Sequence, residues 1–213
     1  VDELLLRLPR DKSIHHSTNP NDATLPRYDL IFDLNFDDSP DSLQYYSYVR
    51  HKTVFVGSVK NHLAQVFSGL RNHVKCNIIG MNTLPTFINR ELAELAVYNP
   101  EDEKTVQEIM GFLGWEYRLV ADRVGMVTPR MVCMIINEAC YTLQEGTADI
   151  EAIDNAMKLG TNYPHGPFEW ADAIGVNHVY EVLEAIYNDT HDERYKICPL
   201  LKTKYLRGES FYQ

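Results

Sequence analysis

Residues 160–176 read GTNYPHGPFEWADAIGV, and this stretch decides the fold of the second half of the chain. Pro164 and Gly166 indicate a tight turn. Pro167 suits the first position of a helix, because its ring fixes a helical φ angle where no N–H donor is needed. Phe168 is predicted to anchor a hydrophobic core. The stretch therefore specifies a turn followed by a helix, which is information about architecture and not about a reaction.

Helical periodicity continues on both sides of this stretch. The predicted helices cover residues 129–145, 149–159, 167–174, 177–187 and 200–206. Thr128 and Pro129 are suited to begin the first of them, and Gly146 is suited to end it. Since no strand pattern separates these helices, an all-α domain is predicted over residues 125–213.

Two of these helices have apolar stripes; the second is predicted to face inward, and both apolar faces suit either core packing or a partner surface. The stripe of residues 129–145 consists of Met131, Ile135, Ala139 and Leu143. The stripe of residues 177–187 consists of Val179, Val182, Leu183 and Ile186.

The first half of the chain alternates strand and helix patterns. Apolar, β-branched runs predict strands over residues 28–36, 52–58, 76–82 and 116–122, and residues 102–113 repeat apolar side chains at helical spacing. Residues 3–8 resemble the end of an amphipathic helix, and residues 90–98 are interpreted as a transitional segment. This alternation favours a partial or shortened Rossmann-like parallel sheet over residues 1–124.

Composition limits the classes of function. The 213 residues carry 20 basic and 30 acidic side chains, so the formal charge of −10 disfavours nucleic acid and anionic membrane surfaces as partners. No apolar run is long enough to span a bilayer, so no membrane partner and a cytoplasmic location are predicted. The sequence opens on Val1, which suggests that residues may precede it in the full protein.

The metal-ligating residue types show no recognisable spacing. The four cysteines, Cys76, Cys133, Cys140 and Cys198, form no CxxC pair, and the eight histidines form no HxH or HxxxH pair. We therefore predict buried free thiols and no metal site.

The opening stretch resembles the C-terminal domain of the 3-hydroxyacyl-CoA dehydrogenase family, whose pattern runs roughly G-x-x-x-P-x-G-P-F-x-x-x-D-x-x-G. The matching positions are Gly160, Pro164, Gly166, Pro167, Phe168, Asp172 and Gly175. Residues 207–212, RGESFY, resemble a shortened form of the family's ending. The resemblance implies a helical domain that mediates a homodimer.

Weaker similarity extends upstream to about residue 28. YDLIFDLNFDD, KTVFVGSVKN, GMNTLPTFINRELAEL and DRVGMVTPR each resemble a block of the family. The family oxidises 3-hydroxyacyl-CoA to 3-oxoacyl-CoA with NAD. In it a histidine acts as general base and a glutamate orients that histidine.

The family's histidine position falls on Asn82, and its glutamate position falls on Glu94. An asparagine has no titratable proton and cannot act as a base. Three substrate-contact positions are also substituted, by Ser58, Lys60 and Pro129, and proline offers neither a side-chain donor nor an amide hydrogen. The resemblance therefore implies a protein that is catalytically impaired or inactive.

The family's cofactor is NAD, but the sequence contains no G-x-G-x-x-G fingerprint. Residues 16–19 read HSTN where a carboxylate for the ribose is expected. No NAD-contacting residue is assigned for this reason.

Three hypotheses follow. The first is a working NAD-dependent dehydrogenase with a changed substrate. The second, which we favour, is a non-catalytic descendant that binds acyl-CoA or serves as a dimerising scaffold. The third is a different reaction that Glu94 performs with Lys60 nearby.

Overall fold

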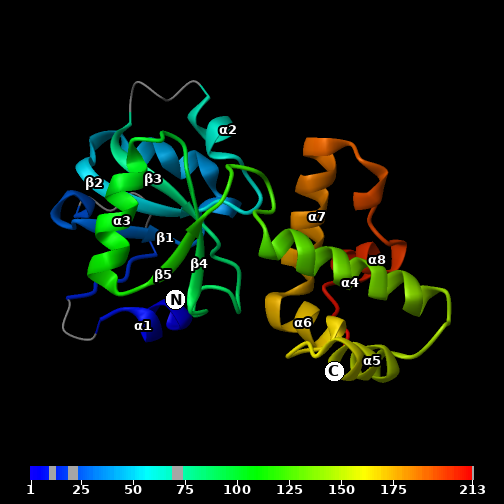
Figure 1. Cartoon of the computed structure of the whole chain (residues 1–213). Coiled ribbons are helices and arrows are strands. Elements are labelled where there is room, and N and C mark those ends of the chain that lie inside the picture. Colours follow the sequence, from blue (N-terminus) through cyan, green and yellow to red (C-terminus); the bar gives the residue numbers. More distant parts are fainter. Residues whose placement is uncertain (10–12, 19–23, 69–73, 213) are drawn as a thin grey trace. The chain divides into compact units, whose positions relative to one another are not determined.

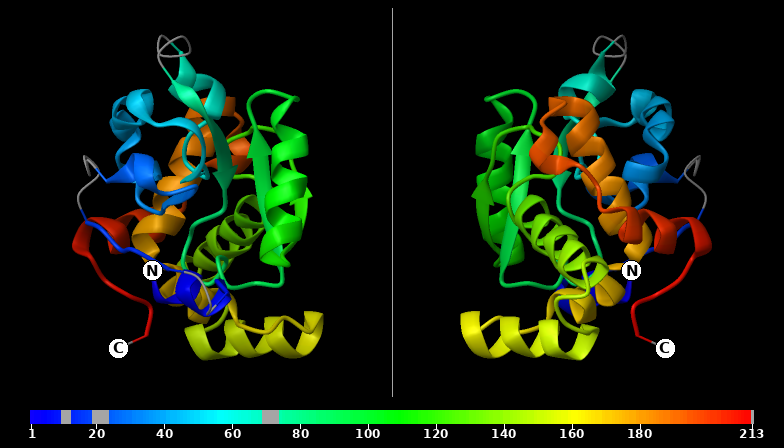
Figure 2. Two further views of the ribbon diagram at one scale, coloured as in Figure 1. Left: turned by 90° about the vertical axis from the view of Figure 1, so that its left-hand side faces the viewer. Right: turned by 90° about the vertical axis from the view of Figure 1, so that its right-hand side faces the viewer.

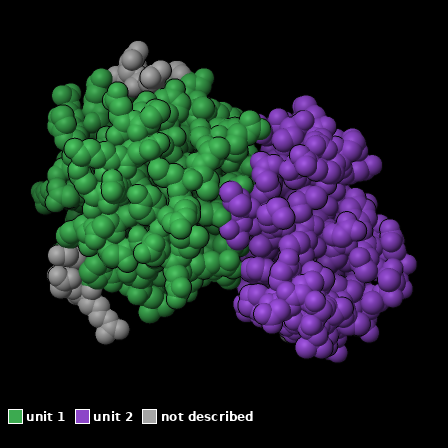
Figure 3. All heavy atoms as spheres, viewed as in Figure 1, with its two compact units in different colours: residues 1–126 green, residues 127–213 purple. Residues whose placement is uncertain are grey.

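The computed structural model describes residues 1–9, 13–18, 24–68 and 74–212 (Figure 1). The chain forms two compact units, residues 1–126 and 127–213, which are coloured separately in Figure 3. The first is an α/β unit and the second is built from helices alone within its described residues. The α/β plus all-α fold predicted from the sequence is confirmed.

The first unit contains a five-stranded sheet among its described residues, in the order β1-β2-β3-β4-β5. Its strands are β1 (Leu30–Asp33), β2 (Arg50–Gly57), β3 (Lys75–Met81), β4 (Leu92–Val97) and β5 (Glu116–Leu119). Its helices are α1 (Asp2–Arg7), α2 (Leu63–Phe67) and α3 (Asp102–Leu113). The 3-10 segments are η1 (Leu25–Arg27), η2 (Phe36–Asp38) and η3 (Pro40–Tyr48).

The expectation of a parallel sheet needs one correction. The pairs β1–β2, β2–β3 and β4–β5 are parallel, but β3 and β4 are antiparallel. The connection between those two strands, residues 82–91, is shorter than the dozen or so residues that a parallel crossover needs. The chain therefore turns back, and the stretch interpreted as transitional is strand β4.

One hydrophobic cluster holds α1 and α3 to the strands. In α3, Val106, Met110 and Leu113 are buried in the same cluster as Phe55 of β2 and Leu95 of β4. Leu4 of α1 and Trp115 belong to it as well. Helix α3 lies against the sheet in both Figure 1 and Figure 2. The packing of α3 follows from its helical repeat of apolar residues, which places them on one side.

The second unit comprises α4 (Thr128–Gln144), α5 (Ile150–Thr161), α6 (Pro167–Ile174), α7 (Val176–Thr190), η4 (Glu193–Tyr195) and α8 (Pro199–Arg207). The predicted inward stripe of α7 is confirmed, because Val179, Val182, Leu183 and Ile186 are all buried.

The apolar stripe of α4 is only partly buried. Met131 is 60% exposed, whereas Ala139 of the predicted stripe is buried together with Val132, Cys133, Ile136 and Cys140. The three cysteines of this unit are free and buried, as predicted.

The motif of residues 160–176 connects α5 to α6 through the side chain of Asp154. Asp154 of α5 is 1% exposed, and its carboxylate accepts the N–H groups of Phe168 (2.8 Å) and Glu169 (3.0 Å) at the start of α6. A Cβ on Gly166 would overlap the Asp154 side chain, so only glycine fits there. Phe168 is fully buried and its ring lies 4.5 Å from that of Phe211.

Phe211 and Tyr212 bind to α5 and α6 in the same region. The carboxylate of Asp172 accepts the N–H groups of Phe211 (2.8 Å) and Tyr212 (2.7 Å). The Tyr212 hydroxyl donates to Asp154 at 2.8 Å. Asp172 and the terminal Phe-Tyr pair, which are far apart in the sequence, thus belong to one fold-determining set.

Candidate functional site

The predicted site positions Ser58, Asn82 and Glu94 meet at one edge of the sheet. Gly57 and Met81 are register partners in β2 and β3, so Ser58 and Asn82 come directly after a paired position. The Ser58 N–H donates to Met81 O at 3.2 Å, and the Asn82 N–H donates to Glu94 O at 3.2 Å. This edge holds the carboxyl ends of β2 and β3, which is where α/β proteins commonly bind ligands.

Asn82 is fixed in a tight turn as the chain leaves β3. Its side chain is 5% exposed, and its Oδ1 accepts the N–H of Leu84 at 3.3 Å. A side-chain amide does not take up a proton near neutral pH. This position can offer hydrogen bonds to a ligand, but it cannot act as a general base.

Glu94 lies within β4, between two buried residues. Ala93 and Leu95 point into the core, so the alternation of a strand places Glu94 on the opposite face, where it is half-buried. Burial lowers the pKa of the Arg90 guanidinium, and the charge of Glu94 opposes that lowering. The charges of Arg90 and Glu94 therefore interact electrostatically.

The loop 58–61 follows β2, and Asp37 binds it through hydrogen bonds. The Asp37 carboxylate accepts the N–H groups of Val59 (2.8 Å) and Lys60 (2.9 Å), and its carbonyl accepts from Asn61 Nδ2 (3.0 Å). Burial raises the pKa of Asp37, although these hydrogen bonds oppose the rise. Within the loop, Ser58 Oγ donates to the Asn61 carbonyl at 3.1 Å. The loop thus has a defined shape that Asp37 imposes.

Lys60 forms an ion pair next to this loop. Its Nζ lies 2.5 Å from Asp38 Oδ1, and its side chain is only 10% exposed. Asp37 and Asp38 were not predicted as site residues. The sequence signal that could have indicated them is the Asp-Asp pair that closes YDLIFDLNFDD, in η2 a few residues after β1.

The chain is similar to known proteins in sequence and in fold. A family model described as 3-hydroxyacyl-CoA dehydrogenase, C-terminal domain, matches residues 125–210. A 3-hydroxybutyryl-CoA dehydrogenase of Bradyrhizobium diazoefficiens is 37% identical over 131 residues, which are 60% of this chain and 43% of that protein. A 3-hydroxyadipyl-CoA dehydrogenase of Escherichia coli is 44% identical over 94 residues, 44% of this chain and 20% of that protein.

The fold agrees with these sequence matches. The crystal structure of (S)-3-hydroxybutyryl-CoA dehydrogenase from Ralstonia eutropha superposes with a TM-score of 0.72 at 26% identity, over 90% of this chain and 69% of that one. Residues 125–210 are thus similar to the C-terminal domain of the 3-hydroxyacyl-CoA dehydrogenase family. The chain spans less than half the length of the curated relatives named above.

The family position at Pro129 lies in the second unit, in the first turn of α4, and Pro129 is buried there. It has no side-chain group that could contact a substrate by a hydrogen bond. The structure thus groups Ser58, Lys60, Asn82 and Glu94 within the first unit, and it shows Pro129 in a fold-determining position of the other.

The family's cofactor does not fit the residues of the first unit. A dinucleotide binds an open α/β sheet where the strand order reverses, beside a glycine-rich turn that opens a helix. The described strands follow one another from β1 to β5 without reversal, and the chain contains no G-x-G-x-x-G. These residues do not supply the dinucleotide site that the family's reaction implies.

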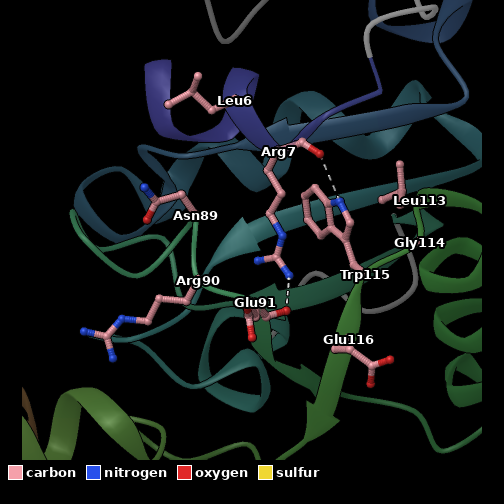
Figure 4. A pocket seen from close by; sticks show the side chains of 9 residues that line it. All are labelled: Leu6, Arg7, Asn89, Arg90, Glu91, Leu113, Gly114, Trp115 and Glu116. Carbon is pink, nitrogen blue, oxygen red and sulfur yellow. Dashed lines mark hydrogen bonds between the residues drawn. The ribbon is translucent and has the colours of Figure 1, made fainter.

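A pocket of about 580 Å³ opens near the start of β5, beside the 82–91 connection (Figure 4). Its walls are Leu6, Arg7, Asn89, Arg90, Glu91, Leu113, Gly114, Trp115 and Glu116. Figure 4 shows the Arg7 side chain extending from α1 between Trp115 and Glu91. Ser58 and Asn82 do not line this pocket.

Two features are absent from the described part of the chain. No group of three or more histidine, cysteine or acidic residues there could hold a metal ion. No helix there is long and apolar enough to cross a membrane.

Proposed function

We propose that this chain is a catalytically impaired or inactive member of the 3-hydroxyacyl-CoA dehydrogenase family that retains an acyl-CoA site. The observation that carries the proposal is Asn82, a buried amide at the family's histidine position, hydrogen-bonded through its backbone to Glu94. Oxidation of a 3-hydroxyl group requires a base that removes its proton. The amide of Asn82 cannot do so, but it can hydrogen-bond an acyl carbonyl or hydroxyl.

The neighbouring groups support binding in preference to proton transfer. Glu94 has the Arg90 cation as its neighbour, and Lys60 is paired with Asp38. Lys60 is therefore engaged with an opposite charge, and the charge of Arg90 acts on Glu94. This arrangement favours the non-catalytic hypothesis over a new reaction carried out by Glu94 and Lys60.

Calorimetry of the full-length protein tests the proposal, with acetoacetyl-CoA and NADH added separately and together. We expect acetoacetyl-CoA to bind and NADH not to bind. Asn82→Ala should weaken acetoacetyl-CoA binding by about 1 kcal/mol, the contribution of one hydrogen bond. Turnover by the wild-type protein, or binding of NADH, would contradict it. Asn82→His, which restores a base but no dinucleotide site, is the matched variant: it should not turn over, and turnover in it would contradict the expectation that the nicotinamide cofactor does not bind.

A second candidate function, a homodimerising scaffold in the cytoplasm, is favoured by one observation. Helix α4 exposes Met131 (60%), and Val127 just before it is 52% exposed. Large exposed apolar side chains close together favour a protein contact. Sedimentation equilibrium should give a dimer for the wild type and a monomer for Met131→Glu. Leu159→Glu, on exposed surface of α5, is the control and should leave the mass unchanged; a monomeric wild type would contradict this function.

A further inference from the structure

Helix α1 forms hydrogen bonds to the 82–91 connection, which lies between Asn82 and Glu94 in the sequence. The Glu3 carboxylate accepts the Thr86 N–H with both oxygens, at 3.0 and 3.1 Å. One turn later, Arg7 donates to the carbonyls of Ile88 (2.9 Å) and Glu91 (2.8 Å). These contacts span more than eighty residues of sequence. Hydrogen bonds that involve a charged group are stronger than those between neutral groups, so α1 binds the connection firmly.

Arg7 is itself held in place. Its guanidinium lies 4.1 Å from the centre of the Trp115 ring, and Trp115 Nε1 donates to the Arg7 carbonyl at 3.3 Å. Leu4, on the same helix, is buried in the core cluster. Figure 4 shows Arg7 reaching Glu91 past the Trp115 ring. Helix α1 is therefore also held to the first unit by contacts other than those to the connection.

The 82–91 connection is strained at Thr86. Its φ of 71° lies in the left-handed region, which a β-branched residue rarely adopts. Thr86 Oγ1 is one of two buried side-chain nitrogen or oxygen atoms, among the described residues, that have no hydrogen-bond partner. Such strain persists only where surrounding contacts impose it, and it occurs preferentially at functional sites. Here the imposing contact is the Glu3 carboxylate on the Thr86 N–H.

We propose that α1 is a positioning element, in which Glu3 and Arg7 hold Thr86 and the 82–91 connection in the conformation that presents Asn82 and Glu94 to the ligand. The proposal rests on the acyl-CoA site proposed above. Since Asn82 opens the connection and Glu94 follows it by a few residues, the shape of the connection determines where the two side chains lie. Glu3 and Arg7 act through this segment, without contact to the ligand.

Amide hydrogen exchange and acetoacetyl-CoA calorimetry on the full chain test the proposal. Glu3→Ala should raise the exchange of residues 84–91 about tenfold and weaken acetoacetyl-CoA binding by a similar factor. Asp2→Ala removes the same charge from the same helical turn and should change neither. Arg7→Lys keeps the positive charge but loses the two-pronged donation, and it should behave like Glu3→Ala.

Thr86→Gly distinguishes positioning from general support. Glycine adopts a positive φ without strain. In the Glu3→Ala background it should therefore restore acetoacetyl-CoA affinity, whereas it could not repair a generally weakened fold. Unchanged exchange in Glu3→Ala and Arg7→Lys would overturn the proposal, and so would lost affinity that Thr86→Gly fails to restore. If the wild type binds no acetoacetyl-CoA, the proposed function fails, and the exchange of residues 84–91 alone decides whether α1 holds the connection.

Discussion

Phe168 is the residue on which the core of the second unit depends most directly. It is fully buried, it packs on Phe211, and its N–H is bound by Asp154. Phe168→Ala should lower the free energy of unfolding by about 3–5 kcal/mol, because it empties a packed site. Urea denaturation measures this. Leu159→Ala, at a position 87% exposed, is the control and should cost less than about 0.5 kcal/mol. A loss below about 1 kcal/mol for Phe168→Ala would mean that the core is elsewhere.

Asp37 should give the first unit a pH dependence of known sign. Its pKa is raised by burial, so the folded state binds the proton more tightly than the unfolded state does. Stability is then lost as pH rises from the unfolded value, about 4, toward the raised one. Asp37→Asn cannot ionise. Its free energy of unfolding, relative to wild type, should therefore increase over that rise in pH.

Chemical denaturation at a series of pH values tests this expectation. Asp41→Asn removes an exposed carboxylate from the neighbouring η3 segment and serves as the control. A difference between Asp37→Asn and wild type that is constant with pH would show that burial does not govern the ionisation of Asp37.

The site residues could be predicted from the sequence only as far as the resemblance reached. Asn82 and Glu94 were predicted from family spacing, and the Asn82 N–H donates to the Glu94 carbonyl at 3.2 Å, while their roles stay a prediction. Asp37 was missed, because its role depends on a loop that follows a different strand. The role of Glu3 depends on a contact with Thr86, far along the chain, which no local pattern indicates.

Among the elements, α3 shows how a helix ends for a local reason. Gly114 follows its last residue at a φ of 67°, and no atom lies within 4 Å of where its Cβ would be. Gly114→Ala should therefore cost about 1–2 kcal/mol of stability from backbone strain alone. Gly111→Ala, in the same helix and also without near atoms, should instead stabilise by about 0.5–1 kcal/mol. Thermal unfolding of both variants checks the pair; equal effects would exclude backbone strain as the cause.

Elements with strong local signals were predicted well, and those that depend on distant partners were not. The bounds of α3 match the predicted 102–113 because its capping and periodicity are local. Strand β4 reads LAELAV, and its Leu, Ala and Glu residues favour a helix. It is a strand because β3 and β5 pair with it. The buried side of α4 could not be predicted, because several apolar phases fit its sequence, and only packing selects among them.

At the scale of the whole molecule, each unit has its own core. Phe168→Ala should accordingly raise amide exchange within residues 127–213 much more than within residues 1–126. Mass-spectrometric hydrogen exchange at moderate urea concentration would show this. A uniform rise over both units would indicate that they unfold as one cooperative body. The division into an α/β half and a helical half was predictable, because strand patterns stop where the helical periodicity begins.

The order of the strands has a consequence for how the protein is made. Each strand from β2 onward pairs with the strand that precedes it in the chain. A ribosome releases the chain from its first residue onward, so every new strand emerges beside an edge that already exists. The sheet can therefore grow strand by strand during translation, and the first unit need not wait for synthesis of the helices that follow it.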